Sequence, residues 1–269
     1  MENKTIYQID AFTDQAFKGN PAGVMILDKL PSTEWMQQMA MEMNLSETAF
    51  VAPNGDGFDI RYYTPSVEIP LCGHATLASA HIMYQIGLKE STESIHFNSK
   101  GGDLNISKDD DGLVMIFPKY SLTPIDTPDN FKEYLGFEPV EFYLTDYNWV
   151  LAVANSQNEI AQFKPNFESL KANGLGRLII TAKGDEADFV CRCFVPAMGV
   201  NEDPVTGSAH CALTPLWTDR LGKNEMTSHQ ISKRKGELKV SMLGNNVKIK
   251  GQAVTVFEAQ LKIRNTSSI

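Results

Sequence analysis

The sequence EIPLCGHA at residues 68–75 recurs as EDPVTGSA at residues 202–209, an offset of 134 residues (202 − 68). A second pair of segments has the same offset, because GDLNIS at residues 102–107 corresponds to GELKVS at residues 236–241. The offset is close to half of the 269-residue chain. Self-similarity at a fixed period is typical of a repeated structural unit. The sequence therefore predicts two similar domains that arose by internal duplication.

The elements around these segments follow the same order in both halves. RYYTP at residues 61–65 matches RCFVP at residues 192–196 with an offset of 131, so the second half has a short insertion before its glycine turn. Each half reads as a strand, a proline turn, a glycine turn, a helix and a hairpin. The hairpins are expected at residues 104–107 with 113–117, and at residues 238–242 with 247–250. This order predicts an α+β fold for each half.

The first half also carries local signals for single elements. Ser32 precedes a run of apolar residues at helical spacing, which predicts a capped helix over residues 33–43. An alanine-rich stretch without a breaker predicts a second helix over residues 75–86, ended by Gly87. β-branched and aromatic residues predict strands at residues 5–12, 24–27, 48–52 and 58–63.

The domain boundaries follow from the repeat and from a change in composition. Prolines and polar residues replace the apolar pattern at residues 118–128, so we expect the linker there. The first domain then spans residues 1–118, with the last strand at residues 253–261 as a candidate addition to its sheet. The second domain spans residues 129–252.

Composition and charge exclude several classes of partner. Apolar residues make up 42% of the chain and charged residues 21%, which is typical of a globular protein. The net charge of −9 is the wrong sign for a protein that binds nucleic acid or an anionic membrane. The segment after Met1 has no signal-peptide pattern, and no run of 18 apolar residues occurs. We expect a cytoplasmic location and a small-molecule substrate.

The cysteines and glycines give no sign of a cofactor. Four cysteines at uneven spacing do not form a disulfide framework in a chain of this length, so we expect reduced thiols. Cys191 and Cys193 share one face of a strand, but no second pair of ligands follows at zinc-site spacing. Residues 174–176 read GLG and lack the third glycine of a dinucleotide fingerprint. We therefore expect no metal and no cofactor.

The glycine turns are the candidate binding elements. A glycine turn that opens a helix presents unpaired backbone N–H groups and a partial positive charge, which favour a carboxylate. Gly73 with Ala75 and Gly207 with Ala209 supply such turns in the two halves, so we expect these four residues to bind substrate. Two such turns across a cleft between the domains would hold a small acid from both sides.

Polar residues that differ between the halves are the candidate catalytic residues. His74 corresponds to Ser208, Asp203 replaces an isoleucine of the first half, and Thr206 corresponds to Cys72. A proton-transfer site needs a histidine or a carboxylate beside an anion-binding turn, and both are present. The alternative is structural: glycine permits the turn, Ser208 caps its helix, and the histidine and the aspartate stabilise the local fold.

Glu47 is the candidate general base. It lies between a predicted helix and an apolar strand, where its side chain would be partly buried at the start of the strand. Burial raises the pKa of a carboxyl group toward the range that suits a general base. The alternative is a capping or solvent-facing glutamate.

Four separated motifs identify a resemblance: DAFT with GNPAGV at residues 10–13 and 19–24, the segment around Glu47, CGHAT at residues 72–76, and EDPVTGSA at residues 202–209. Together they resemble the PhzF-like isomerases, which are named for a phenazine-biosynthesis enzyme. The resemblance implies two similar domains, each a sheet wrapped around a central helix, as in diaminopimelate epimerase. It also implies a cofactor-free active site between the domains and a homodimer.

The resemblance further implies roles for single residues. Glu47 would be the general base that moves a proton between carbons of a cyclic amino-hydroxy-diene carboxylic acid. His74, Asp203 and Ser208 would line the pocket and orient the substrate or relay protons. Phenazine synthesis itself does not follow from the resemblance.

Two alternative functions stay open. Epimerases with the same architecture use two thiols, whereas this chain has Cys72 in one turn and Thr206 in the other. A non-catalytic protein that binds a small acid is the second alternative. A Glu47→Gln variant that folds and binds without turnover would separate catalysis from binding.

Overall fold

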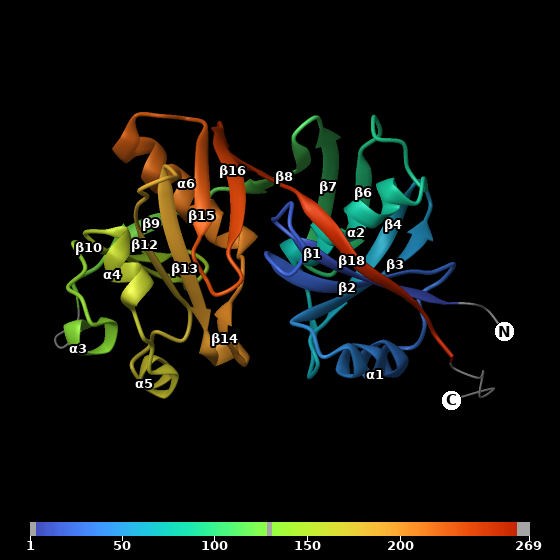
Figure 1. The fold of residues 1–269 in the computed structure, drawn as a ribbon, viewed down its shortest axis with the longest axis horizontal. Coiled ribbons are helices and arrows are strands. Elements are labelled where there is room, and N and C mark those ends of the chain that lie inside the picture. Colours follow the sequence, from blue (N-terminus) through green and yellow to red (C-terminus); the bar gives the residue numbers. More distant parts are fainter. Residues whose placement is uncertain (1–3, 128–130, 263–269) are drawn as a thin grey trace. The chain divides into compact units, whose positions relative to one another are not determined.

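The computed structural model describes residues 4–127 and 131–262. The chain divides into two compact units: unit 1 comprises Met1–Met115 with Gln252–Ile269, and unit 2 comprises Ile116–Gly251 (Figure 1). Met1, Pro128 and Asp129, on which parts of the chain-start and linker predictions rested, lie outside the described residues.

Unit 1 contains a sheet in the order β18-β1-β2-β3-β4-β6-β7-β8. Strand β1 pairs antiparallel with both β2 and the C-terminal strand β18, which lies beside it in Figure 1. The pairs β2–β3 and β4–β6 are parallel. The elements are β1 (Thr5–Ala11), β2 (Asn20–Ile26), α1 (Thr33–Met43), β3 (Glu47–Asn54), β4 (Gly57–Tyr63), β5 (Glu68–Ile69), α2 (Gly73–Gln85), β6 (Ile95–Ser99), β7 (Gly102–Asp109), β8 (Gly112–Pro118) and β18 (Ala253–Gln260).

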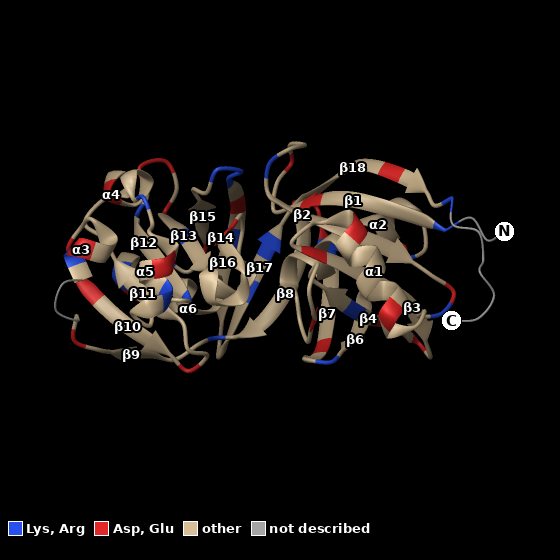
Figure 2. Ribbon diagram, turned by 90° about the horizontal axis from the view of Figure 1, so that it is seen from below, with Lys and Arg blue, Asp and Glu red and all other residues tan. Residues whose placement is uncertain are grey.

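Helix α2 forms the centre of unit 1. Nine of its 13 residues are buried, and it contacts β1, β2, β3 and β18. The helix contains no Lys, Arg, Asp or Glu, whereas charged segments of both signs are spread over the surrounding elements (Figure 2). A helix that is apolar on all sides must be covered on all sides. The sheet of unit 1 therefore wraps around α2, as the resemblance implied.

Unit 2 repeats this arrangement strand by strand. Its sheet runs β9-β10-β11-β12-β13-β15-β16-β17, and the pairs β11–β12 and β13–β15 are parallel, like β2–β3 and β4–β6. Helix α6 takes the place of α2 and buries seven of its 12 residues. The elements are β9 (Leu122–Pro124), α3 (Phe131–Leu135), β10 (Glu141–Thr145), β11 (Val150–Val153), α4 (Gln157–Gln162), α5 (Phe167–Ala172), β12 (Leu178–Lys183), β13 (Phe189–Val195), η1 (Pro196–Met198), β14 (Val200–Asp203), η2 (Gly207–Ala209), α6 (His210–Leu221), β15 (Met226–Gln230), β16 (Gly236–Leu243) and β17 (Asn246–Gly251).

Helix α1 begins and ends where its sequence signals predicted. The Ser32 side chain accepts a hydrogen bond from the backbone N–H of Trp35, and Asn44 ends the helix in the left-handed conformation (φ 49°). Met36 and Met39 of α1 pack into the core cluster of Phe50 on β3. The end of α1 thus fixes where β3 can begin, and Glu47 is the first residue of that strand.

Three local expectations were wrong. Strand β2 begins at Asn20 rather than at residue 24, because residues 20–24 already pair with β1. Residues 122–124, expected in the linker, form the short strand β9, which pairs with β10. In unit 2 the glycine turn does not open the α-helix directly, since the 3₁₀ turn η2 (Gly207–Ala209) comes between them.

No helix among the described residues is long and apolar enough to cross a membrane.

Candidate functional site

Glu47 and His74 come from two elements that meet inside unit 1. Glu47 opens β3 and pairs with Ala22 of β2. His74 is the second residue of α2, directly after Gly73, and Cys72 is the residue that precedes the helix. Because the sheet wraps around α2, the start of this helix lies next to the start of β3. The fold therefore joins two motifs that are 27 residues apart in the sequence (74 − 47).

The side chains of Glu47, His74 and Cys72 form a short buried row. Nε2 of His74 lies 3.2 Å from Oε2 of Glu47, and the exposed fractions of the two side chains are 7% and 13%. On the other side of the ring, Nδ1 of His74 lies 3.4 Å from Sγ of Cys72. The Oε2 atom of Glu47 is fully buried. Its close contact with His74 is an ion pair.

The pKa of Glu47 is lowered, whereas its position in the sequence predicted a raised pKa. Burial raises the pKa of this carboxyl group, but the charge of His74 and hydrogen bonds from His74, Ser46 and Cys72 together outweigh burial. Burial lowers the pKa of His74, but Cys72 and Glu47 beside the ring leave it well above the ordinary value. Burial raises the pKa of the Cys72 thiol. These directions favour the ion pair of Glu47 with His74.

Two further polar residues hold the imidazole ring. Nδ2 of Asn20 lies 3.2 Å from Nδ1 of His74, and Asn20 is fully buried. The Ser46 hydroxyl lies 3.5 Å from Nε2 of His74 and donates to the backbone oxygen of Pro21 at 3.3 Å. Neither residue was among the site residues predicted from the sequence. Asn20 belongs to the GNPAGV motif, so this motif was the sequence signal that could have indicated a role for Asn20.

The N-terminus of α2 is open to an anion. Cys72 makes no regular side-chain cap hydrogen bond to this 13-residue helix, although the backbone N–H of Ala75 contacts its sulfur. A Cβ atom placed on Gly73 would meet no atom within 4 Å. The neighbouring Ala75 is fully buried. Gly73 thus borders free space at a helix end that carries a partial positive charge.

In unit 2 the counterpart turn is held by hydrogen bonds. The Thr206 hydroxyl donates to Oδ2 of Asp203, the last residue of β14. The buried Gln230 side chain donates to the backbone oxygen of Asp203 at 2.7 Å, and its carbonyl accepts from the backbone N–H of Thr206 at 2.8 Å. Thr206 occupies the repeat position of Cys72. The residue at the repeat position of the Cys72 thiol therefore orients an acid.

The remaining candidates of unit 2 lie together in η2. Gly207, Ser208 and Ala209 form this single turn, and α6 follows it. Ser208 is not the N-cap of α6, because that position is Ala209, which lacks a side-chain cap. The structural alternative for Ser208, a helix cap, is therefore wrong. His210 has both ring nitrogens in contact with protein oxygens, at 3.0 Å from the Thr206 carbonyl and 2.8 Å from the Ser228 hydroxyl.

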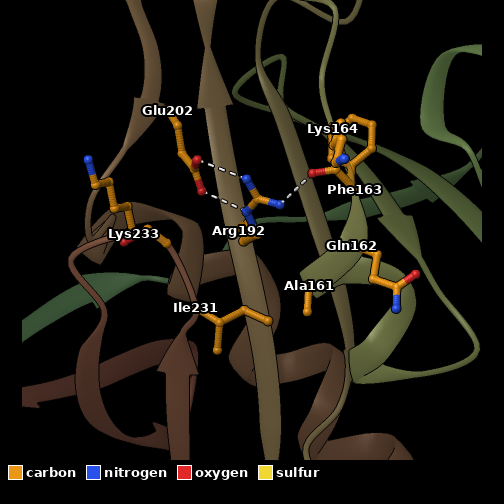
Figure 3. Close-up of a pocket in the computed structure, with 9 residues that line it drawn as sticks. Ala161, Gln162, Phe163, Lys164, Arg192, Glu202, Ile231 and Lys233 are labelled. Atoms are coloured by element: carbon orange, nitrogen blue, oxygen red, sulfur yellow. Dashed lines mark hydrogen bonds and ion pairs between the residues drawn. The ribbon is translucent and has the colours of Figure 1, made fainter.

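An arginine–glutamate pair precedes each of the two turns. Arg192 of β13 donates from Nε and Nη2 to the two carboxylate oxygens of Glu202 at 2.7 and 2.9 Å, beside a cavity of about 730 Å³ (Figure 3). Arg61 of β4 makes the same two-pronged contact with Glu68 in unit 1. The glutamates precede Thr206 and Cys72 by four residues each. The duplication has thus kept one ion pair beside each turn.

One group among the described residues could hold a metal ion. The ligand atoms of Glu47, Cys72 and His74 all lie within 4.8 Å of one another. The site residues predicted from sequence thus form two groups: Glu47, His74, Gly73 and Ala75 lie together in unit 1, and Asp203, Gly207, Ser208 and Ala209 lie together in unit 2.

Comparison with known proteins identifies the family. The profile of the phenazine biosynthesis-like protein family matches residues 9–259. An uncharacterised isomerase from Halalkalibacterium halodurans is 43% identical over 264 residues, which cover 97% of this chain and 99% of that protein. An uncharacterised isomerase from Pseudomonas aeruginosa is 42% identical over 257 residues, 96% of this chain and 98% of that protein.

Comparison with solved structures indicates the same family as these relatives. A PhzF family protein from Enterococcus faecalis superposes with a TM-score of 0.93 at 37% identity, covering 97% of this chain and 100% of that one. A hydroxyproline epimerase from Agrobacterium vitis shares the fold, with a TM-score of 0.67 at 10% identity, covering 97% and 91% of the two chains. The predicted α+β, epimerase-like fold and the PhzF-like resemblance are confirmed. The chain belongs to the phenazine biosynthesis-like protein family and is an isomerase.

Proposed function

We propose that the protein moves a proton between two carbons of a small carboxylic acid, with Glu47 as the general base and without a metal or cofactor. The observation that carries this proposal is the buried carboxylate of Glu47 at 3.2 Å from His74, beside the open N-terminus of α2. A general base must be unprotonated when the substrate arrives, and the lowered pKa of Glu47 meets that condition. The resemblance suggests a cyclic amino or hydroxy acid as the substrate.

The chemistry can be written with these groups alone. The carboxylate of Glu47 takes a proton from a carbon of the substrate, and the electron pair of the broken C–H bond spreads into the conjugated acid. The N-terminal N–H groups of α2 stabilise the negative charge that develops on the substrate carboxylate. The protonated Glu47 then returns the proton to a different carbon, which restores both the carboxylate and the charge of the substrate. Asn20 and Ser46 hold the His74 ring in place during the transfer.

For the turn in unit 2 we propose the roles that the resemblance assigns to its residues. Asp203 and Ser208 differ from their repeat partners in unit 1, and Asp203 is oriented by Thr206. An oriented acid suits the reprotonation or the binding of an amino group, and the N–H groups around Gly207 and Ala209 suit a second carboxylate oxygen. These roles are predictions from the repeat and the resemblance.

Two-thiol epimerase chemistry is the alternative that this site fits less well. The hydroxyl of Thr206 takes the place of the second thiol, and it donates to Asp203 while accepting from Gln230 at 3.2 Å. A hydroxyl held in this way serves to orient its neighbours. Its ordinary acidity is also far below that of a thiol, so it would be a poor replacement base.

The test is deuterium uptake from D₂O into a panel of cyclic and acyclic amino and hydroxy acids, followed by NMR. Wild type should exchange one carbon-bound hydrogen of its substrate, and Glu47→Gln should slow that exchange by about 10²–10⁴-fold. Glu42→Gln is the matched control, because Glu42 is exposed on α1. Exchange that persists in Glu47→Gln would overturn the assignment of the base. Binding of an acid without exchange in wild type would favour the non-catalytic alternative.

The resemblance also predicts a homodimer, which sedimentation equilibrium of the purified protein would test directly.

A further inference from the structure

We propose that a cavity in unit 2 is a second binding site of this protein, and that it binds a small dicarboxylate. The cavity has a volume of about 730 Å³, within the range of about 300–1,000 Å³ that is typical of small-molecule sites. All of its lining residues belong to unit 2, and Arg192 and Glu202 lie at its centre (Figure 3). None of the candidate catalytic residues lines it, so the cavity is not part of the proposed proton-transfer site.

The cavity lies on the face of the sheet that is turned away from α6. Cys191 on β13 is fully buried and interacts with His210 at the start of α6. Neighbouring side chains on a strand point to opposite faces of the sheet, so Arg192 points away from α6. On that face its guanidinium group meets the C-terminal end of α4 and donates from Nη1 to the backbone oxygens of Ile160 and Phe163. The end of α4 thus forms one wall of the cavity.

The ion pair at the centre of the cavity is satisfied within the protein. Nε and Nη2 of Arg192 donate to the two carboxylate oxygens of Glu202 at 2.7 and 2.9 Å. The carbonyl oxygens at a helix C-terminus carry a partial negative charge, which would repel an anion. Arg192 covers two such oxygens at the end of α4, at 3.0 and 2.9 Å. The arginine therefore weakens the repulsion of an anion by α4, while its own charge is balanced by Glu202.

Two lysines of the cavity, Lys164 and Lys233, have no ion-pair partner in the part of the chain that the structure describes. Lys164 comes shortly after α4, and Lys233 comes shortly after β15. Figure 3 shows them on opposite sides of Arg192. Unit 1 uses a lysine differently, because Lys100 binds Glu68, the glutamate of the corresponding ion pair, at 2.7 Å. The two lysines of the cavity are therefore available to a ligand.

The charges of the cavity favour an anion with two ends. The chain as a whole carries a net charge of −9, whereas the three basic residues and one acid that line the cavity sum to +2 (3 − 1). A carboxylate beside each lysine would form a charge-assisted hydrogen bond at both ends of the ligand. The apolar side chains of Phe163 and Ile231 also line the cavity and suit the hydrocarbon segment between two carboxylates. Because the lysines come from opposite sides, two separated carboxylates fit them better than one compact anion.

The experiment is a titration of the purified wild-type protein with succinate, followed by ¹H–¹⁵N NMR spectra. The ionic strength is kept constant, because salt screens exposed charges. Succinate should shift the backbone amide signals of residues 161–164 and 231–233 in a saturable way. Acetate has a single carboxylate and loses one charge-assisted hydrogen bond, so it should bind at least about 10-fold more weakly. Inorganic phosphate, a compact anion, should also bind more weakly than succinate.

Variants of the two lysines locate the site. Lys164→Gln and Lys233→Gln should each weaken succinate binding by about 3–10-fold, because each removes one partly exposed charged contact. The double variant should give no saturable shift. Lys183→Gln is the matched control and should bind like wild type, because Lys183 is an exposed lysine of unit 2 that does not line the cavity. All three lysines are exposed, so the variants should fold, and circular dichroism checks this.

The proposal is overturned if wild type shows no saturable shift with succinate, or if binding survives in the folded double variant. Acetate or phosphate that binds at the same residues as tightly as succinate would overturn the choice of a dicarboxylate. None of these measurements uses turnover. A failed deuterium-exchange test would therefore leave the succinate result readable, and a failed succinate titration would leave the general-base proposal intact.

Discussion

The Thr206 hydroxyl donates a hydrogen bond to the Asp203 carboxylate, at the repeat position where unit 1 has a thiol. The same hydroxyl accepts from the buried Gln230 amide at 3.2 Å. The turn of unit 2 therefore has a hydroxyl where the turn of unit 1 has a thiol, and this hydroxyl holds an acid in place. The two halves of this protein share a scaffold but differ in the chemistry that the scaffold presents.

Removal of the Thr206 hydroxyl should measurably destabilise the folded protein. In Thr206→Val, Asp203 loses a donor and Gln230 loses an acceptor inside a buried cluster, which should lower the free energy of unfolding by about 1–3 kcal/mol. Urea denaturation measures this change in the free energy of unfolding. Thr214→Val is the matched control, because the Thr214 hydroxyl is buried without a hydrogen-bond partner. That control should be neutral or stabilising, and an equal loss in both variants would contradict the role of Thr206.

A methyl group at Gly73 should separate function from stability. A Cβ at this position meets no atom within 4 Å, so Gly73→Ala should fold and gain up to about 1 kcal/mol from helix propensity. The same methyl group occupies the free space where we propose that the substrate carboxylate binds, so the deuterium-exchange rate should fall steeply. Gly101→Ala is the contrasting variant for stability. Its new Cβ would lie 2.7 Å from the Cβ of Leu71, so it has no free space to occupy. Full activity in a folded Gly73→Ala would contradict the proposed carboxylate site.

The arginine–glutamate pairs should contribute coupling energy. The guanidinium group of Arg192 donates to both carboxylate oxygens of Glu202. It also donates to the backbone oxygens of Ile160 and Phe163 at 3.0 and 2.9 Å. The side chains of the pair are only 11% and 20% exposed. A double-mutant cycle of Arg192→Met and Glu202→Gln should give a coupling of about 0.5–3 kcal/mol in urea unfolding.

An exposed pair supplies the comparison for that cycle. Lys132 and Glu138 are 3.9 Å apart with side chains 72% and 77% exposed, and solvent screening should leave them without measurable coupling. Arg192→Lys should recover only part of the coupling, since an ammonium cannot bridge both carboxylate oxygens. Equal coupling in the two cycles would show that the pair before the turn has no special role.

The ion pair of Glu47 and His74 should make stability depend on pH. The pKa of Glu47 is lowered from 4.5, so its contribution is fully present above pH 4.5 and is lost as the pH falls through the lowered pKa. The pKa of His74 is raised from 6.5, so its contribution is fully present below pH 6.5 and is lost as the pH rises through the raised pKa. Both contributions are therefore complete between pH 4.5 and 6.5.

Urea unfolding at a series of pH values tests this window. The difference in unfolding free energy between wild type and Glu47→Gln should be greatest inside the window and should shrink on both sides of it. Glu42→Gln, with its exposed side chain, should show a difference that stays near zero throughout. A flat profile for Glu47→Gln would mean that the two groups do not titrate as a pair.

The elements with local signals were predictable from sequence. Helix α1 was predicted over residues 33–43 because Ser32 caps it and its apolar residues have helical spacing, and its bounds are Thr33–Met43. The hairpins were predictable because their turns carry Asp, Asn and Gly. The repeat revealed the two-unit architecture because both copies keep their turns at corresponding positions.

The electrostatics of the site were not predictable in the same way. The pKa of Glu47 was expected to rise because burial was the one influence visible in the sequence, whereas the opposing partner is His74, on another element. Gln230 was overlooked because it lies 24 residues beyond Thr206 and meets the turn only through the parallel pairing of β13 and β15. Contacts between distant segments decide such features, and a single sequence does not display them.

The pairing of β18 with β1 has a consequence for synthesis of the chain. Strand β1 begins at Thr5 and β18 ends at Gln260, so the sheet of unit 1 needs segments that precede and follow unit 2 in the sequence. Unit 2 is one continuous stretch, Ile116–Gly251. On the ribosome, unit 2 is therefore fully translated before unit 1 receives its last strand. Until β18 has been translated, that edge of β1 lacks its partner strand, and an unpaired strand edge is a site of aggregation.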